Sequence, residues 1–195
     1  MFVFPSSPIN FQFLTFPQGP SYDLKVSASL NSKASCKGSQ DWLSEMAKSS
    51  TILSSITKVI HPELFEMGLD SMRNMSNLET LKDVLELWWS LFNGIQVISN
   101  RETPVHRDHS SLSCWYDLLT MVGPYKTTYL EPPGVGLRFS YGSGTVVGLC
   151  GRVLRHGVSL ADGERICIAC YMRENIQRRL GSKFASWNFW DNYRY

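Results

Sequence analysis

The sequence lacks both a regular cysteine framework and a long apolar run. These absences argue against a disulfide-stabilised secreted domain and against a membrane-spanning protein. Five cysteines among 195 residues are an odd number at irregular spacing, which is not the framework of a small disulfide-stabilised secreted domain. We therefore expect a reducing compartment. No stretch approaches the roughly 18 consecutive apolar residues that a membrane-spanning helix requires, so we expect no membrane partner. The length suffices for one domain with a substantial core.

The first 40 residues differ in texture from the rest of the chain. Their opening, "MFVFPSSPINFQFLTFP", contains no basic residue and is interrupted by prolines, which does not fit a secretory signal peptide. We predict an N-terminal arm over residues 1–40, partly ordered, with a short strand near Tyr22–Val26. A single domain is predicted over 41–195.

Residues 41–92 are predicted to form helices that support the rest of this domain. Asp41 is a candidate N-cap, and Pro62 suits the first turn of a second helix. A third helix is predicted from Asn77 onward because apolar residues recur there at spacings of three and four. The adjacent Trp88–Trp89 pair is expected to pack against a core or sheet.

From residue 93 to 180 the chain is predicted to be the β-rich core, followed by a tail over 181–195. Short runs such as "GIQVIS", "GTVVGLC" and "RICIACYM" are separated by Gly and Pro turns. They do not alternate with ten-residue helical patterns, which argues against a doubly wound parallel sheet. We expect an α+β fold with a β-sandwich or small barrel backed by the N-terminal helices.

Positive charge is concentrated in the second half of the chain. Residues 1–100 carry 7 basic and 9 acidic side chains, whereas residues 101–195 carry 12 and 8, and ten of those twelve are Arg. Planar guanidinium groups suit the recognition of phosphates and carboxylates. The alternative is an ordinary solvated face, since the net charge is only +2.

The stretch "TPVHRDHSS" contains a candidate metal site. If it is a strand, His106 and Asp108 share one face and Arg107 and His109 lie on the other. Two His and one carboxylate suit a non-haem Fe(II) centre, and His156 in "LRHGV" can supply the third ligand. His-x-Asp is weak evidence alone, and its alternative is a polar turn with a hydrogen-bonded Asp.

A possible anion anchor follows the third ligand. Arg165 lies nine residues after His156, at the start of "RICIACYMR", and a buried Arg can bind the far carboxylate of a dicarboxylate cosubstrate. The alternate residues Ile166, Ile168, Cys170 and Met172 are predicted to pack outside the barrel. The face shared with Arg165 comprises Cys167, Ala169, Tyr171 and Arg173.

Longer motifs then resemble a known family. "NRETPVHRD", "YDLLTMVGPY", "YGSGTVVGLCGRVLRHGV" and "DGERICIACYMRENI" are similar to the TET/JBP family of Fe(II)/2-oxoglutarate-dependent dioxygenases, specifically to the short TET-like proteins of mushrooms. The resemblance covers roughly residues 85–180. It implies a double-stranded β-helix core of the jelly-roll or cupin type, with Fe(II), 2-oxoglutarate and O2 as cofactors.

The resemblance also implies roles for individual residues. His106, Asp108 and His156 correspond to the iron ligands, and Arg165 to the anchor of the distal carboxylate of 2-oxoglutarate. Arg101 corresponds to an Arg that reaches toward the cosubstrate, with a strand-end salt bridge as its alternative role.

The remaining residues of the same face correspond to the substrate pocket. Cys167 would lie beside the cosubstrate, and Ala169 would leave room for the substrate methyl group. Tyr171 matches the aromatic position that stacks on a flipped base, and Arg173 the position that contacts the base edge. Several relatives carry His where Arg173 stands, which leaves the base preference open. The alternative roles of Tyr171 and Arg173 are a core Tyr and a surface Arg.

The implied function is oxidation of 5-methylcytosine in DNA, with base flipping, to the hydroxymethyl, formyl and carboxyl products. One alternative is demethylation of N6-methyladenine in DNA or RNA. Another is an inactive nucleic-acid-binding or interaction module, which the short arm and the unusual tail "SKFASWNFWDNYRY" leave open. Methylated DNA is the expected partner, the protein is expected to be a monomer, and the substrate implies a nuclear location.

Three other patterns give weaker evidence of function. Cys167-x-x-Cys170 lies within a predicted strand, where the two thiols face opposite sides, so a zinc knuckle is not expected. "GVGLRFSYGSG" is not followed by the helix that a phosphate-binding loop requires. His61 precedes a predicted helix start and is expected to be structural.

Overall fold

The computed structural model describes residues 9–12, 14–15, 25–26, 37–109 and 111–189. Most of the predicted arm therefore lies outside the described residues, as do the last six residues of the predicted tail. The described parts of the arm are three short strands, β1 (Ile9–Gln12), β2 (Leu14–Thr15) and β3 (Lys25–Val26), and residues 37–40. The last four residues already belong to the first helix, α2 (Lys37–Glu45), so the helical part of the chain begins earlier than the predicted residue 41. β1 is an edge strand of the main sheet, whereas β2 and β3 pair only with each other.

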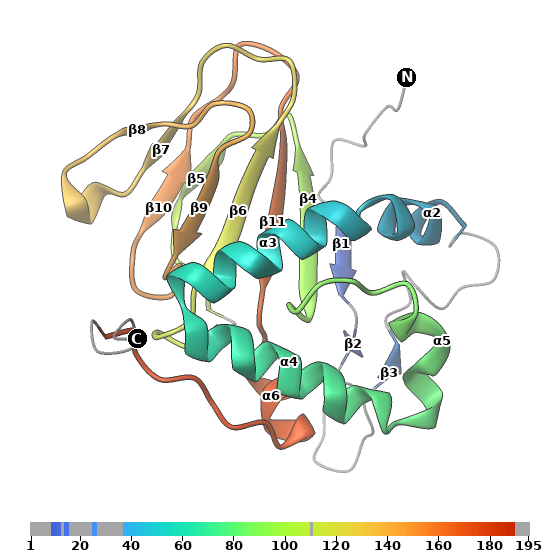
Figure 1. Ribbon diagram of the computed structural model, residues 1–195. Coiled ribbons are helices and arrows are strands. Elements are labelled where there is room, and N and C mark those ends of the chain that lie inside the picture. The colour runs from blue at the N-terminus through green and yellow to red at the C-terminus, as the bar shows by residue number, and fades with distance from the viewer. Residues whose placement is uncertain (1–8, 13, 16–24, 27–36, 110, 190–195) are drawn as a thin grey trace.

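Two antiparallel sheets form the body of the molecule (Figure 1). The larger sheet has the strand order β1-β4-β11-β6-β9, and the smaller has the order β5-β10-β7-β8. The further strands of the larger sheet are β4 (Gly94–Ser99), β6 (Asp117–Val122), β9 (Val146–Leu149) and β11 (Ile166–Tyr171). Those of the smaller sheet are β5 (Thr103–His106), β7 (Tyr129–Glu131), β8 (Phe139–Ser140) and β10 (His156–Val158).

The N-terminal helices cover the outer face of the larger sheet, and α3 crosses in front of its strands (Figure 1). The predicted α+β architecture of antiparallel sheets backed by helices is confirmed. The longer helices are α2 (Lys37–Glu45), α3 (Ala47–Ile60) and α4 (Pro62–Ser76), and a last helix, α6 (Glu174–Leu180), follows β11. A 3-10 turn, η2 (Pro133–Val135), lies between β7 and β8.

Helix boundaries agree with the sequence in one case and differ in two. Pro62 opens α4 as predicted, and the His61 imidazole caps this helix by accepting the Leu64 N–H at 3.3 Å. Asp41 is not an N-cap, because α2 begins at Lys37 and ends before Met46. Asn77 ends α4 and does not open a long helix.

The predicted third helix is reduced to the 3-10 turn η1 (Glu79–Leu81) and the single turn α5 (Lys82–Leu85). Beyond it the chain bends to bury Trp88, whose indole N–H donates to the Phe92 carbonyl at 2.9 Å. Burial of apolar side chains in this loop replaces the regular helix that their spacing predicted, since tertiary packing outweighs helix propensity.

Alternate side chains along β11 point into two different apolar cores, as predicted. Cys167 and Ala169 point between the two sheets, where they pack with residues of both. Ile168 and Cys170 point the other way, into the core shared with the helices. One strand therefore links the helical layer to the space enclosed by the sheets.

The Trp88–Trp89 pair offers a matched test of this packing. Trp88 is 2% exposed and Trp89 is 58% exposed, so only the first is part of the core. We expect Trp88→Ala to lower the free energy of unfolding by about 3–5 kcal/mol through cavity formation. Trp89→Ala should change it by less than about 1 kcal/mol. Urea unfolding of both variants measures the difference, and equal effects would contradict this assignment of the core.

Candidate functional site

Pairing of β5 with β10 brings two distant histidines together. His106 and His156 are direct cross-strand partners, and their ring centroids are 4.4 Å apart. Asp108 follows two residues after the end of β5, where its backbone N–H donates to the Gly151 carbonyl at 3.0 Å. The three residues predicted as metal ligands are therefore neighbours in space, although 50 residues separate the two histidines.

The three side chains converge on one point. Asp108 Oδ1 lies 3.4 Å from His106 Nε2, and Asp108 Oδ2 lies 3.6 Å from His156 Nε2. One potential ligand atom from each residue lies within 4.8 Å of the others. Both Nδ1 atoms face backbone carbonyls, Pro104 at 2.9 Å and Leu154 at 3.1 Å, which orients the rings and leaves Nε2 for a metal.

The chemistry of this cluster fits a divalent transition metal. Two imidazoles and one carboxylate on one side of an ion form the facial triad of non-haem Fe(II) sites, with open positions for further ligands. Burial lowers the pKa of His156 and so favours the neutral imidazole, which is the form that binds metals.

Gly151 allows the carboxylate to reach its position. A Cβ atom at Gly151 would lie 2.2 Å from Asp108 Oδ2, closer than any real contact. The glycine thus leaves room for the ligand. It lies in the motif "YGSGTVVGLCGRVLRHGV", from which only His156 was predicted to take part in the site.

The residues between and after the ligands take other roles. Arg107 is exposed and donates to the Val153 carbonyl at 3.1 Å. His109 was predicted to face away from the site, but it lines the cavity described below. The reason is that β5 ends at His106, so strict strand alternation does not extend to residue 109.

A cavity of about 230 Å³ opens onto the histidine–carboxylate cluster. Seven of the nine predicted site residues line it: His106, Asp108, His156, Cys167, Ala169, Tyr171 and Arg173. Arg165 and Arg101 do not line it. A strand face predicted from the alternation of β11 therefore contributes much of its wall.

Arg165 is buried near Cys167, which lines the cavity. Its side chain is 1% exposed, and its Nη2 donates to the Arg101 carbonyl. Nε has no hydrogen-bond partner among the described residues. The ionisable groups that act on it within the described part of the chain are Cys167, Tyr125 and Tyr141, none of which is a carboxylate. A buried guanidinium with an unused donor in such surroundings suits an anionic ligand. Arg101 itself is exposed, and only its backbone contacts Arg165.

Tyr171 lies over a glycine of the adjacent strand. Gly94 is its cross-strand partner, and a Cβ atom there would lie 2.2 Å from Tyr171 Cε2. The guanidinium carbon of Arg173 lies 5.1 Å from the Tyr171 ring centroid. The Tyr171 ring thus packs directly on the backbone of Gly94, a contact that the sequence did not predict.

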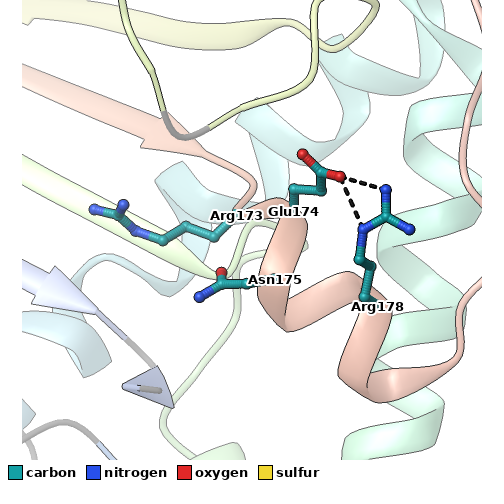
Figure 2. A pocket seen from close by; sticks show the side chains of 4 residues that line it. All are labelled: Arg173, Glu174, Asn175 and Arg178. Carbon is teal, nitrogen blue, oxygen red and sulfur yellow. Dashed lines mark hydrogen bonds and ion pairs between the residues drawn. The ribbon is translucent and has the colours of Figure 1, made fainter. Parts of the chain in front are cut away.

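Arg173 points away from the charged pair that follows it. Figure 2 shows its side chain leaving the start of α6 on the side opposite the ion pair between Glu174 and Arg178. Its backbone N–H donates to Asn93 Oδ1 at 2.9 Å, which fixes the chain at this point.

Asp117 is a cavity residue that sequence reasoning missed. It is the first residue of β6, lines the cavity and is 4% exposed, and the Ser111 hydroxyl donates to its Oδ1 at 2.9 Å. Burial, and then the nearby charge of Asp108, raise its pKa to about 8. Two sequence signals were present: an acid precedes the apolar run of "DLLTMV", and it lies in the family-like motif "YDLLTMVGPY".

The position of Gly151 generates a prediction about metal binding. Gly151→Ala should displace the Asp108 carboxylate and weaken Co(II) binding at least tenfold, measured by titration of the metal-free protein. Gly142→Ala is the matched control, because no described atom lies within 4 Å of a Cβ there. Unchanged affinity in Gly151→Ala would contradict the role given to Asp108.

The buried carboxyl of Asp117 predicts a pH dependence of stability in the metal-free protein. Its pKa is about 8 in the folded chain against an ordinary value of 3.8, so the folded state holds a proton that the unfolded state releases. This group therefore destabilises the fold as pH rises from about 4 to about 8. Relative to wild type, Asp117→Asn should gain stability over that range. Urea unfolding at several pH values measures this, and a pH-independent difference would contradict it.

Comparison with known proteins agrees with the site. The Tet_JBP family, described as the oxygenase domain of the 2OGFeDO superfamily, matches residues 23–174. No curated protein sequence matches the chain.

Two solved structures align with this chain, and the first of them shows a related fold. NgTET1 in complex with 5mC DNA aligns with a TM-score of 0.60 at 15% identity, covering 95% of this chain and 66% of that chain. A Cupin 2 conserved barrel domain protein from Salinispora arenicola aligns with a TM-score of 0.33 at 17% identity, covering 45% of this chain and 69% of that chain. This chain thus spans about two thirds of the length of the NgTET1 chain. Because the family match covers more than half of its residues, the chain belongs to the Tet_JBP family of 2-oxoglutarate- and Fe(II)-dependent oxygenases.

Proposed function

We propose that this oxygenase oxidises the methyl group of 5-methylcytosine in DNA. The observation that carries the proposal is that Tyr171, Arg173 and Ala169 line the same cavity as the histidine–carboxylate cluster. An aromatic ring, a cation and a small side chain are the components needed to hold a methylated base close to a metal.

His106, Asp108 and His156 would hold the iron, and Arg165 the distal carboxylate of 2-oxoglutarate. With O2, iron and 2-oxoglutarate supply an oxidant that hydroxylates a nearby C–H bond, while 2-oxoglutarate becomes succinate and CO2. Cys167 lies near Arg165 and lines the cavity, so the cosubstrate would lie beside it. The protein's own part is to position the methyl group and exclude water.

The substrate base must leave the duplex to enter this cavity. Extrusion costs a few kcal/mol of stacking and pairing, and stacking on an aromatic side chain returns about 1–3 kcal/mol. Tyr171 is seated on Gly94 and therefore presents a fixed ring for that contact. Ala169 leaves space for the methyl group, and Arg173 contacts the base edge.

The nucleic-acid partner is supported by charge and by similarity. Ten arginines in residues 101–195 suit phosphate contacts, whose strength falls as salt rises. The fold resembles NgTET1, which was solved in complex with 5mC DNA. Stepwise oxidation to formyl- and carboxylcytosine and a nuclear location belong to the same proposal. No described helix is long and apolar enough to span a membrane.

N6-methyladenine is the second candidate substrate. Arg173 stands where several relatives carry His, and both bases present a ring nitrogen beside an exocyclic nitrogen. Hydroxylation of the N6-methyl group would end in demethylation. An inactive binding module is the third candidate, and the same assay separates it from both.

The test uses purified protein with iron, 2-oxoglutarate and methylated oligonucleotides, read by mass spectrometry. We expect oxidised 5-methylcytosine and succinate in wild type. The double variant His106→Ala, Asp108→Ala should lose turnover at least a thousandfold, because two of the three ligands are gone, while DNA affinity changes less than about threefold.

Two outcomes would contradict the proposal. Folded, metal-loaded wild type that forms neither succinate nor an oxidised base would exclude the enzyme. Full activity in the double variant would exclude these ligands. Asp70→Ala is the control, because this exposed carboxylate pairs only with Arg73 on the surface of α4.

A further inference from the structure

The residues on either side of the Asp108 ligand are bonded to one turn, at residues 150–154. Arg107 Nε donates to the Val153 carbonyl at 3.1 Å, and Arg152 Nη1 donates to the His109 carbonyl at 2.5 Å. Each segment thus sends one arginine to the backbone of the other. We propose that Arg107 and Arg152 are positioning residues, an arginine clasp that holds the Asp108 carboxylate toward the metal. This inference deepens the proposed function at its metal site and rests on the ligands named there.

Asp108 needs such support because the sheet does not reach it. β5 ends at His106, two residues earlier, whereas both histidine ligands lie in paired strands. The backbone N–H of Asp108 donates to the Gly151 carbonyl at 3.0 Å. A single hydrogen bond permits rotation about itself, but bonds at three consecutive residues fix the direction in which the middle side chain leaves the backbone. The clasp supplies the two outer bonds.

The same turn also orients a second ligand. The Val153 and Leu154 N–H groups both donate to the Cys150 carbonyl, at 3.0 and 2.9 Å, which closes the turn. The Leu154 carbonyl in turn lies 3.1 Å from His156 Nδ1. A turn that is fixed to the segment of Asp108 therefore fixes the separation of two ligands from distant parts of the chain. Loss of groups that support metal ligands in this way typically weakens metal binding by about 10–100-fold.

The charge of the two arginines gives the proposal a direction that can be measured. Arg107 and Arg152 are exposed, and neither forms an ion pair in the part of the chain that the structure describes. A positive charge near a divalent cation opposes its binding. If charge alone mattered, removal of either arginine would tighten metal binding. Loss of the clasp weakens binding instead, so the sign of the change separates positioning from electrostatics.

Titration of the metal-free protein with Co(II) tests the clasp, with visible absorption as the measure of binding and of ligand geometry. We expect Arg152→Ala to weaken Co(II) binding about tenfold, and Arg107→Ala to change it in the same direction. Arg152→Lys, which keeps a cationic donor at this position, should recover most of the loss.

Arg155→Ala is the matched control for both alanine variants. It removes an exposed arginine that follows the same turn and whose side chain makes no hydrogen bond or ion pair within the described ranges. Its Co(II) affinity should stay within about twofold of wild type.

A second measurement shows whether the effect passes through Asp108. In an Asp108→Ala background, Arg152→Ala should change Co(II) affinity by less than about twofold, because no carboxylate remains to be positioned. Urea unfolding of the metal-free variants shows that they fold. Arg107→Ala tests the opposite half of the clasp and decides the matter if Arg152→Ala does not fold.

The outcomes distinguish this inference from the function on which it rests. Unchanged or tighter Co(II) binding in the folded arginine variants would overturn the clasp and leave the metal site intact. An equal loss in the Asp108→Ala background would also overturn it, since the effect would then not act through that ligand. Wild type that binds no Co(II) would overturn the ligands themselves, and this inference with them. No methylated base enters the titration, so a wrong substrate would leave its result unchanged.

Discussion

Pairing between β5 and β10 is the interaction on which the candidate site depends. Neither strand is long, yet their register places His106 directly opposite His156. A shift of one residue would turn one imidazole to the other face of the sheet, since side chains alternate along a strand. The backbone bond from Asp108 to Gly151 then closes the third side of the cluster. Three hydrogen-bonded segments, and not a single motif, thus build the metal site.

The larger sheet packs on both faces, and one of these faces forms part of the cavity wall. β11 contributes Ile168 and Cys170 to the helical core and Cys167 and Ala169 to the space between the sheets. A side chain in the cavity is therefore connected through one strand to the packing of α3 and α4. The proposed substrate residues at the end of β11 are positioned by the most extensively paired strand of the fold. Rigid elements of this kind hold functional groups more accurately than loops do.

Much of the fold and cavity was predictable because strand alternation is a strong local signal. The two faces of β11 followed from its sequence, as did Pro62 at the start of α4. The short α5 did not, because the burial of Trp88 depends on partners far away in sequence. Asp117 and Gly151 were missed for a similar reason. Both lie within the motifs that resemble the family, but their proximity to Asp108 arises from tertiary contacts that the motifs alone do not reveal.

Arg165 carries a consequence for how the protein responds to its surroundings. Its guanidinium is buried, its Nε has no partner among the described residues, and the ionisable groups acting on it there are a thiol and two phenols, so the folded chain holds a positive charge that an external anion can neutralise. Any dicarboxylate that binds there stabilises only the folded state. By mass action a concentration of 100 times the dissociation constant adds about 2.7 kcal/mol. The lifetime of the folded chain in a cell would thus follow the supply of its cosubstrate. A cell short of the cosubstrate would contain less of the folded protein, and the remaining protein would turn over more slowly.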